Sequence, residues 1–410
     1  MRHLLILFAT LFVFLSCSKD DGPTSSPVYK ATRTVIAYMA GENDLSSILQ
    51  EDISEMVAGR KEVADDANLV VFVDKADKDT RPFIARITKD EIHPVDTLYK
   101  YEEDFVSSDP EAMRDVIARS IAFCPATRDY GLVLWGHADG WIIESDSVAA
   151  ARRAYGRDTG DNTTSKTKGK WLNIPSMRQA LEATGVHWKF IFCDCCNMQA
   201  IEAAYELRNL TDYIIASPAE ITGSGAPYDV IVKDFYLQDD NSLVTSLCSD
   251  YHAQADYVGG HLPISAIRTS EVEQLASATR RVLPAVSHYL ATADDPTLGI
   301  IYYYAYDRVL EKEKVMYDMR DMIRAALQGE PEAYTEWQKA FYQAVVCWEM
   351  SNYWHANTIY FSDFTVTEER YGGVSMFFPL EKYATSHNNY NETIKRMSWY
   401  YAVGWPELGW

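Results

Sequence analysis

The sequence lacks any apolar run long enough to cross a bilayer, because its longest, residues 4–15, is too short to span the hydrocarbon core. Basic residues are also few: 38 Lys and Arg stand against 59 Asp and Glu, which gives a formal net charge of −21. Nucleic acid is therefore excluded as a partner, since its phosphates need Lys and Arg. There is no internal repeat or low-complexity segment, and a hydrophobic content of 47% excludes a mainly disordered chain. The 410 residues can bury a large core, in one large domain or two.

Cysteine is scarce as well, with seven residues in the chain, and three of them, Cys193, Cys195 and Cys196, lie within four positions. This spacing is unlike a disulfide scaffold, although a local disulfide involving Cys193 or Cys195 stays open. Paired C-x-x-C motifs and spaced histidine ligands are missing, so the residues predict no metal site there. The absence of a G-x-S-x-G elbow disfavours a serine hydrolase. The absence of a D-x-D-x-D loop leaves no calcium motif.

The N-terminus is predicted to be a targeting segment. A basic start and the apolar run 4–15 are typical of a signal peptide, here residues 1–16. The run ends in LSC, which resembles a bacterial lipobox, with Cys17 as the lipidated first residue of the mature protein. Residues 18–21, SKDD, resemble the acidic export tag of surface lipoproteins in Bacteroidetes. Residues 17–30 are then a lipidated tether, and the protein is an outer-membrane lipoprotein exposed at the cell surface. An ordinary secretory signal with a chance cysteine is the alternative.

Strand-like apolar runs alternate with helical segments from residue 31 onward, which is typical of a mostly parallel sheet with helices on both faces. Strands are expected at 34–39, 68–73, 131–135, 189–193, 213–217, 263–268, 358–366 and 373–378. Helices are expected at 44–58, 109–122, 175–184, 197–208, 270–292, 313–328 and 331–350. A hairpin at 82–89 and 92–98 interrupts the alternation. The pattern predicts an α/β core over 31–260, and a helix-rich C-terminal part with a short β element over 261–410.

Two of the apolar runs stop abruptly at reactive side chains. Residues 131–137, GLVLWGH, end at His137, and residues 190–196, FIFCDCC, end at Cys196. Buried parallel strands have continuous apolar runs, and open α/β sheets bind ligands at the carboxyl ends of their strands. A histidine and a cysteine brought to the same sheet edge are the two catalytic side chains that a cysteine hydrolase requires. A lone buried cysteine or histidine is usually structural, so the pairing carries the hypothesis. No comparable strand-end position is held by the other histidines, His93, His187, His252, His261, His288, His355 and His387.

The reactivity of the Cys196 thiol depends on its neighbours. The helix expected from Asn197, a favourable N-cap residue, favours the thiolate through its dipole. Asp194 opposes this by its like charge, so the direction of the pKa shift stays open. Strand alternation places Asp194 and Cys196 on the same side. There, Asp194 either binds a basic substrate side chain or caps the following helix. His137 either accepts the thiol proton or donates a proton to the leaving group.

Four motifs resemble those of the clostripain family of cysteine peptidases. Residues 135–141, WGHADGW, resemble its W-x-H-G-x-G-W histidine motif, and residues 194–198, DCCNM, resemble its D-A-C-L-M nucleophile motif. Residues 38–45, YMAGENDL, resemble its opening Y-M-A-A-D-N-x-L, and residues 373–379, GVSMFFP, resemble its G-x-S-x-x-F-P element. In this order, the four motifs extend the resemblance from about residue 34 to the C-terminus.

The resemblance implies a caspase-like α/β fold and a His–Cys dyad. Carried over by motif position, His137 is the catalytic histidine and Cys196 is the nucleophile, while Cys195 stands at the motif's alanine and is a bystander. The implied oxyanion hole consists of the backbone N–H groups of Ala138 and Cys196. Ala138 replaces the family's glycine, and its N–H keeps this role if its φ is negative.

A substrate preference follows from the same resemblance. Asp194 matches an aspartate associated with the pocket for Arg or Lys at P1, the residue before the cleaved bond, and Glu220 is a weaker pocket candidate. Some relatives cleave themselves after a basic residue between the histidine and the cysteine. The segment 152–170 suits such a site, because it has no apolar periodicity and is predicted to be an exposed loop; a merely solvated loop is the alternative. Its basic residues are Arg152, Arg153, Arg157, Lys166, Lys168 and Lys170. Calcium is implied by the resemblance alone, so no cofactor is predicted.

The sequence therefore predicts a surface-anchored cysteine endopeptidase that cleaves peptide or protein substrates through a thioester acyl-enzyme. It is expected to contact the membrane through its N-terminal lipid and to prefer Arg or Lys at P1. The alternative is a non-catalytic surface lipoprotein that binds peptide or glycan through aromatic side chains, among them Tyr302, Tyr303, Tyr304, Trp348, Trp354, Trp399 and Trp405. Nothing in the sequence predicts the oligomeric state.

Overall fold

The computed structural model describes residues 27–143, 154–164, 169–253, 262–308, 311–354, 359–384 and 389–410. The predicted signal peptide, the lipidation site Cys17 and most of the tether lie outside the described residues. So do four of the basic residues of the segment 152–170, namely Arg152, Arg153, Lys166 and Lys168. Among the helices that can be examined, none combines the length and the apolar character needed to cross a bilayer.

A single large sheet organises the fold. Its middle is parallel and consists of β1 (Ala31–Gly41), β2 (Ala67–Lys75), β5 (Ala126–Trp135), β8 (Trp188–Asp194) and β9 (Thr211–Ala216). Antiparallel strands extend both edges: β3 (Phe83–Ile87), β4 (Val95–Lys100), β10 (Ile264–Arg268) and β13 (Val345–Glu349). The strand order is β13-β10-β9-β8-β5-β1-β2-β3-β4. The predicted mostly parallel sheet and its hairpin are confirmed.

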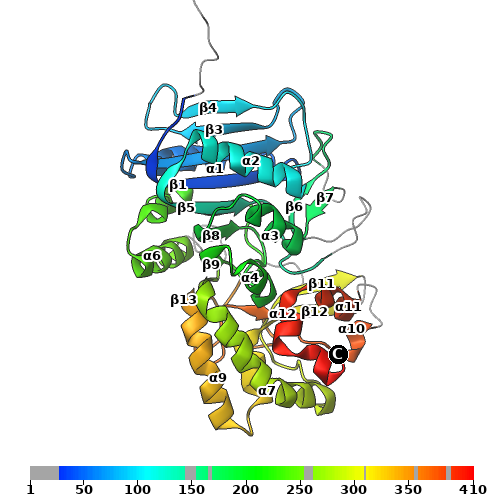
Figure 1. Ribbon diagram of the computed structural model, residues 1–410. Helices are drawn as coiled ribbons and strands as arrows, with labels where there is room; N and C mark the ends of the chain where they lie inside the picture. Colours follow the sequence, from blue (N-terminus) through cyan, green and yellow to red (C-terminus); the bar gives the residue numbers. More distant parts are fainter. Residues whose placement is uncertain are drawn as a thin grey trace, which may run out of the picture.

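The alternation of side chains along β1 explains why helices cover both faces of this sheet. Val35, Ala37 and Met39 enter one buried cluster, and the intervening residues enter the other. The first cluster is completed by α1 (Leu49–Arg60), α5 (Tyr228–Ile231) and α6 (Asp240–Ala253). The second is completed by α2 (Pro110–Phe123), α3 (Ile174–Glu182) and α4 (Ile201–Leu207) (Figure 1).

The C-terminal part is rich in helices, as predicted, and it contains a small second sheet. Its longer helices are α7 (Val272–Thr292), α8 (Met319–Ala326) and α9 (Pro331–Ala344), and short ones follow at α10 (Glu381–Ala384), α11 (Tyr390–Thr393) and α12 (Ser398–Val403). The small sheet is β11 (Tyr302–Arg308), β12 (Glu311–Asp318) and β14 (Ser375–Met376). A domain boundary between 260 and 261 stays a prediction; β10 and β13, from beyond it, belong to the central sheet.

Three C-terminal elements differ from the sequence-based expectation. The helix expected at 313–328 is β12 followed by α8, because pairing with β11 and β14 outweighs local helix preference. The helix expected at 331–350 ends at Ala344, where the β-branched and aromatic residues of β13 pair with β10 instead. No strand forms over 359–366. There, Phe361 and Phe364 pack on Trp354, so the apolar pattern marks burial without strand pairing.

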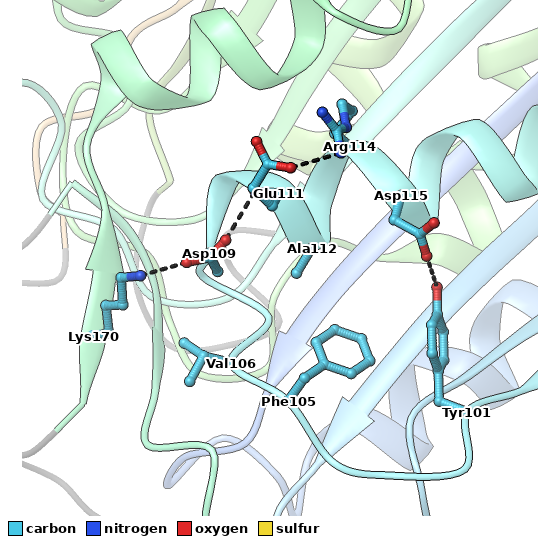
Figure 2. Close-up of a pocket in the computed structure, with 9 residues that line it drawn as sticks. All are labelled: Tyr101, Phe105, Val106, Asp109, Glu111, Ala112, Arg114, Asp115 and Lys170. Atoms are coloured by element: carbon cyan, nitrogen blue, oxygen red, sulfur yellow. Dashed lines mark hydrogen bonds and ion pairs between the residues drawn. The ribbon is translucent and has the colours of Figure 1, made fainter.

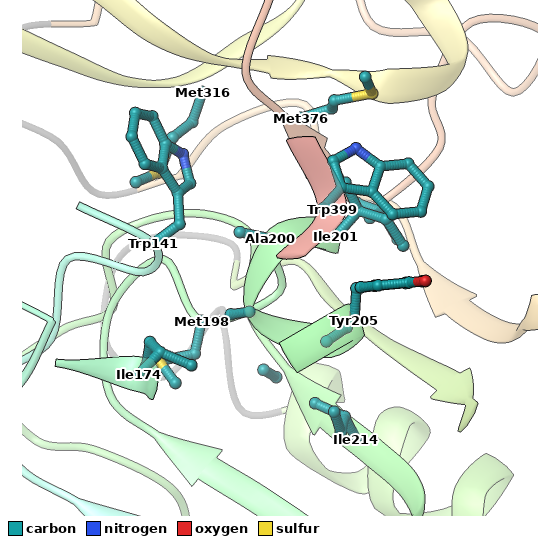
Figure 3. Packing of buried hydrophobic residues seen from close by; sticks show 14 of the residues in the cluster. Trp141, Ile174, Met198, Ala200, Ile201, Tyr205, Ile214, Met316, Met376 and Trp399 are labelled. Atoms are coloured by element: carbon teal, nitrogen blue, oxygen red, sulfur yellow. The ribbon is translucent and has the colours of Figure 1, made fainter. Parts of the chain in front are cut away.

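The aromatic residues proposed for a binding surface lie mostly in the core. Trp354, Trp399 and Trp405 are buried, as are Tyr302 and Tyr303, while Tyr304 and Trp348 are half-buried. Figure 3 shows Trp399 of α12 beside α4, where its ring lies 5.4 Å from that of Tyr205. These rings join the C-terminal part to the sheet, and they do not form an exposed aromatic patch.

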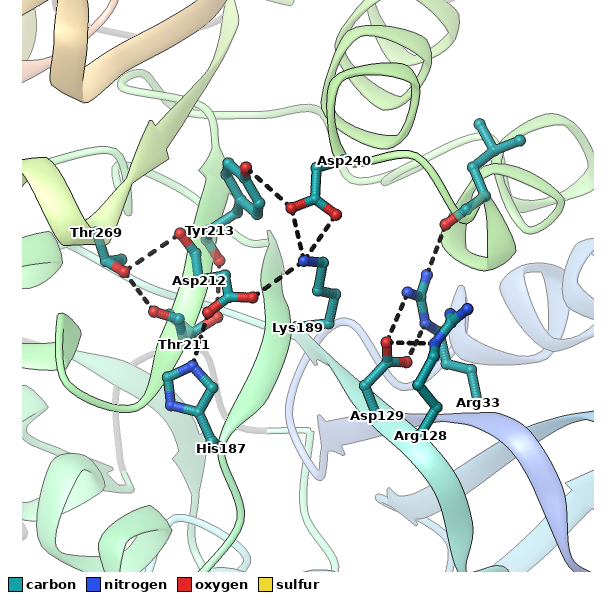
Figure 4. A network of polar contacts seen from close by, with 11 residues as sticks. Arg33, Arg128, Asp129, His187, Lys189, Thr211, Asp212, Tyr213, Asp240 and Thr269 are labelled. Carbon is teal, nitrogen blue, oxygen red and sulfur yellow. Dashed lines mark hydrogen bonds and ion pairs between the residues drawn. The ribbon is translucent and has the colours of Figure 1, made fainter.

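Ion pairs connect the amino ends of the central strands (Figure 4). Arg33 of β1 binds Asp129 of β5, and Lys189 of β8 lies 3.0 Å from Asp212 of β9. The Nε2 atom of His187 lies 2.8 Å from the Oδ1 atom of Asp212. All of these residues lie near strand beginnings, so the carboxyl ends of the same strands lie at the opposite edge of the sheet.

Candidate active site

A pocket of about 160 Å³ opens at the carboxyl ends of β5 and β8. It brings together three of the predicted site residues, His137, Asp194 and Cys196, which are far apart in the sequence. Its other lining residues are Leu45, Trp135, Gly136, Ile221, Thr222, Gly223 and Gly225. Ala138 and Glu220 are not part of the lining.

His137 is placed by a sharp turn after β5. Gly136 has φ +138°, and a Cβ atom there would lie 3.0 Å from the carbonyl oxygen of Ala40, so glycine is required. The carbonyl of His137 then accepts a hydrogen bond from the N–H of Gly156 (2.8 Å), in the strand β6 (Tyr155–Asp158). Ala138 has a negative φ. The alanine therefore fits this turn without strain.

Asp44 and Arg157 contact the histidine, and sequence reasoning assigned neither of them a role at the active site. Asp44 Oδ1 lies 2.9 Å from His137 Nε2, and Arg157 Nη2 lies 3.3 Å from that nitrogen and pairs with Asp44. Burial raises the pKa of Asp44, but hydrogen bonding to His137 and the charges of His137 and Arg157 outweigh it and bring the pKa to about 2. Asp44 lies within the motif 38–45, and this motif was the sequence feature that could have identified it as a site residue.

The position of Arg157 corrects one expectation. The segment 152–170 was predicted to be an exposed loop, yet residues 155–158 form the buried strand β6, which pairs with β7 (Lys170–Leu172). The side chain of Arg157 is 3% exposed and faces the site. A charged side chain can be buried in this way because Asp44 supplies the opposite charge.

The backbone at Cys196 also differs from the prediction. The expected helix at 197–208 begins at Ile201, and Asn197 is no N-cap, because its φ is +60°. The N–H of Asn197 donates to the carbonyl of Ala219 (2.9 Å), so the chain first runs beside the segment after β9. Cys196 therefore receives no help from a helix dipole.

The Cys196 thiol lies in surroundings that favour its neutral form. Its sulfur accepts a hydrogen bond from the N–H of Ile221 at 3.4 Å. Burial raises the pKa of the thiol, the charges of Glu220, Asp139 and Asp194 raise it further, and the Ile221 N–H offsets only part of this. The sequence left the direction of the pKa shift of Cys196 open, and the structure shows that the pKa is raised. The resting thiol therefore keeps its proton near neutral pH.

The neighbouring cysteines are buried and do not line the pocket. Cys195 is fully buried and Cys193 is 3% exposed, and both are free thiols. The local disulfide that the sequence left open is not formed.

Asp194 lies at the pocket wall with a second carboxylate behind it. Asp194 accepts a hydrogen bond from the Tyr228 hydroxyl (2.8 Å), and its other oxygen has no partner among the described residues. Asp52, from α1, accepts a hydrogen bond from Trp135 Nε1 (2.5 Å). A Cβ atom on Gly225 would lie 2.9 Å from Asp194 and 3.4 Å from Asp52, so both carboxylates reach the same backbone.

Burial raises the pKa of both carboxyl groups. For Asp194 the pKa is about 6, because burial outweighs hydrogen bonds from Tyr228 and the Ala226 N–H. For Asp52 it is about 8, because burial is reinforced by the charge of Asp194. Sequence reasoning missed Asp52, which belongs to an ordinary helical pattern. Glu220 is half-buried and acts on Cys196 through its charge.

Other features lie outside this pocket. Figure 2 shows a larger, shallow hollow of about 530 Å³ at the start of α2, lined by Tyr101 and Phe105 among others. None of the predicted site residues lines it. Three carboxylates, Glu42, Asp74 and Asp158, form a buried cluster near the carboxyl ends of β1 and β2.

Comparisons with known proteins agree with the fold and the motif positions. The sequence model of the clostripain family matches residues 37–410. A secreted C11 cysteine protease from Bacteroides thetaiotaomicron, solved with an irreversible peptide inhibitor, is 29% identical, with a TM-score of 0.75 over 92% of this chain and 100% of that one. An inactive zymogen C11 protease from Parabacteroides distasonis is 25% identical, with a TM-score of 0.71 over 91% and 98%.

A further secreted C11 protease from Bacteroides thetaiotaomicron, iotapain, is 19% identical, with a TM-score of 0.72 over 92% of this chain and 99% of that one, and shows the shared fold. The comparison with curated protein sequences gave no match. The family match extends over both of the strand ends that carry the histidine and the cysteine. The protein is a member of the clostripain family, the C11 cysteine proteases, and hence a hydrolase that acts on peptide or protein substrates.

Proposed function

We propose that the protein is a cysteine endopeptidase in which His137 and Cys196 form the catalytic dyad. The observation that carries this proposal is the pocket at the sheet edge, which both side chains line. Because the resting thiol is protonated, His137 has to take the proton as the sulfur attacks the substrate carbonyl carbon. The C–N bond then breaks, the amine leaves with a proton from His137, and water hydrolyses the thioester to restore the thiol.

The oxyanion that forms during attack needs donors already in place. The proposed donors are the backbone N–H groups of Ala138 and Cys196. Neither N–H takes part in a hydrogen bond within the described residues, and Ala138 has the negative φ that this role requires. Asp44 acts as a positioning residue, because its oxygen is 2.9 Å from His137 Nε2 and restrains the ring.

A basic P1 side chain is the substrate feature that fits this pocket. Asp194 offers an oxygen with no partner in the described structure, and Asp52 adds a second carboxylate behind it. Burial and the charge of Asp194 raise the pKa of Asp52 to about 8, and an ammonium or guanidinium group of the substrate favours the ionised form of both acids. Glu220 contributes negative potential beside the sulfur and has a lesser part in this recognition.

Peptides that differ only at P1 test the proposed specificity. We expect cleavage after Lys and Arg with kcat/KM about 100-fold or more above that for norleucine, an uncharged residue of similar length. Glutamate at P1 is expected to be cleaved more slowly still. Equal cleavage after norleucine and lysine would show that the carboxylates do not select the substrate.

Surface anchoring and self-cleavage complete the proposal. The solved relative of Bacteroides thetaiotaomicron is described as secreted and that of Parabacteroides distasonis as an inactive zymogen, which supports export and activation by processing. A lipid on Cys17 would hold the enzyme at the outer membrane. Cleavage after a basic residue in the segment 152–170 would activate it.

Self-cleavage is tested by incubating the purified wild type beside Cys196→Ala. The wild type should split into two fragments whose new end follows Arg or Lys in 152–170, while the variant stays intact. Identical intact chains in both samples would refute self-processing. Identical fragments in both would point to another protease.

A further inference from the structure

Two cysteines outside the active-site pocket lie against each other at the outer edge of the central sheet. Cys248 belongs to α6, and Cys347 belongs to the edge strand β13, on which α6 packs. Both side chains belong to the apolar cluster on that face of the sheet, where Cys248 is fully buried and Cys347 is half-buried. The proposed catalytic chemistry uses neither of them.

The strongest influence on each of these two thiols is the other thiol. Hydrogen bonding to Cys347 raises the pKa of Cys248, and burial acts in the same direction. The same hydrogen bond lowers the pKa of Cys347, because it outweighs burial and the charge of Glu349. A hydrogen bond between thiols requires the two sulfur atoms to be in contact, so the side chains already point at each other. Of the two, Cys347 is the thiol that ionises first.

Accessibility distinguishes this pair from the other cysteines that interact. Cys193 and Cys195 also form a hydrogen bond with each other, but both are buried, so an oxidant dissolved in water does not reach them. In the pair of Cys248 and Cys347, the half-buried thiol is also the one with the lowered pKa. Exposure and thiolate character together determine which thiols react with an oxidant. Both thiols of this pair are free in the structure.

We propose that Cys248 and Cys347 form a disulfide bond when the exported protein meets a low-molecular-weight disulfide. The Cys347 thiolate attacks one sulfur of that disulfide, which gives a mixed disulfide and releases the first thiolate. The released thiolate takes the proton of Cys248, whose sulfur then attacks the Cys347 sulfur and releases the second thiol. Two protein thiols are oxidised, and the oxidant is reduced to two thiols. The export proposed above brings the chain to compartments where disulfides form and persist.

The bond would fasten the edge of the sheet near the active site. It closes the chain between Cys248 and Cys347 into one long loop that contains β10, α7, α8 and α9. β13 pairs with β10, and the carbonyl of Ser265 in β10 accepts a hydrogen bond from Gln199 Nε2 at 2.7 Å. Gln199 is three residues after Cys196, so the segment that follows the proposed nucleophile rests on this edge. The inference is independent of the catalytic proposal, because the bond can be detected without any substrate.

Peptide mapping of the full chain tests the bond directly. The folded protein is treated with oxidised glutathione, its remaining thiols are alkylated, and trypsin then places Cys248 and Cys347 in separate peptides, residues 234–268 and 340–370. We expect the two peptides to be joined in the oxidised sample and to separate after reduction. Alkylated peptides, or mixed disulfides with glutathione and no joined pair, would overturn the inference. This map uses the wild type and needs no variant.

Thermal unfolding measures the effect of the bond on stability. Oxidation should raise the Tm of the wild type by about 5 °C, because the bond restricts a long loop in the unfolded chain. Cys347→Ser should lose this shift and should fold, since the residue is half-buried. The matched control is Cys124→Ala, which removes a buried thiol outside the pair and should keep the full shift. An equal shift in Cys347→Ser and the wild type, or no shift in a wild type whose peptides are joined, would contradict the stabilising role.

Discussion

Replacing Cys196 with alanine is expected to lower kcat/KM for a peptide with lysine at P1 by about 10⁴-fold or more, because no other group in the pocket can form the thioester. Among the described residues that line the pocket, Cys196 alone carries a thiol. The remaining oxyanion donors and His137 can hold a substrate but supply no nucleophile. Fluorogenic peptide assays with active-site titration measure the loss.

Cys195→Ala is the matched control, one residue away in the same turn. Cys195 is fully buried and outside the pocket, so its removal should leave kcat/KM within a few-fold. It should lower stability by about 1 kcal/mol through the small cavity it leaves. Loss of activity in Cys195→Ala together with retained activity in Cys196→Ala would reverse the assignment of the nucleophile.

The second large effect is expected for Asp194→Asn. This change keeps the shape of the side chain and an oxygen for the Tyr228 hydroxyl, but removes the charge that faces the pocket. For lysine at P1 we expect kcat/KM to fall about 10²- to 10³-fold, since an unpaired buried charge costs about 3–5 kcal/mol. For norleucine at P1 the change should be less than about threefold.

The same carboxyl group predicts a pH dependence. Its pKa is about 6, so it is ionised above that pH and binds a cation best there. Below pH 6, protonation should reduce the ratio of kcat/KM for lysine over norleucine, and this ratio cancels the titration of His137 and Cys196. The ratio in Asp194→Asn should stay flat. A wild-type ratio that is flat from pH 5 to 8, despite high selectivity, would contradict the role of Asp194.

Ionisation of Asp194, which favours binding of a basic substrate, lowers the stability of the folded protein. Because the folded-state pKa is above the ordinary value of 3.8, the folded protein holds this proton more tightly than the unfolded chain. The contribution of Asp194 to the free energy of unfolding is therefore largest below pH 4, and it falls as the pH rises to 6. Asp194→Asn should be at least as stable as the wild type above pH 6.

Much of this fold could be predicted from local sequence. The central strands are continuous apolar runs, and their ends place His137 and Cys196 at one edge, as expected for a parallel sheet. The prediction was wrong where long-range pairing decides the structure. β12 lies where a helix was expected. Asn197 donates its backbone N–H to Ala219 in a neighbouring segment instead of capping a helix.

The parts of the site that sequence reasoning missed share one physical cause. Asp44, Arg157 and Asp52 reach the pocket from elements whose proximity depends on the whole sheet. In the sequence, Arg157 is one of several charged residues in a segment expected to be a loop, and Asp52 is one of several acids in a segment expected to be a helix. Only packing shows that the first pairs with Asp44 and that the second lies behind Asp194.

The assignment of Cys196 as the nucleophile is tested most directly by the position at which a peptide chloromethyl ketone with lysine at P1 alkylates the enzyme. Trypsin cuts after Lys189 and Arg208 and releases one peptide with Cys193, Cys195 and Cys196, and fragment ions distinguish the three. We expect one adduct per chain, on Cys196, prevented by excess lysine-P1 substrate and strongly reduced in Asp194→Asn. An adduct on Cys193 or Cys195, or none in a sample that cleaves peptides, would contradict it.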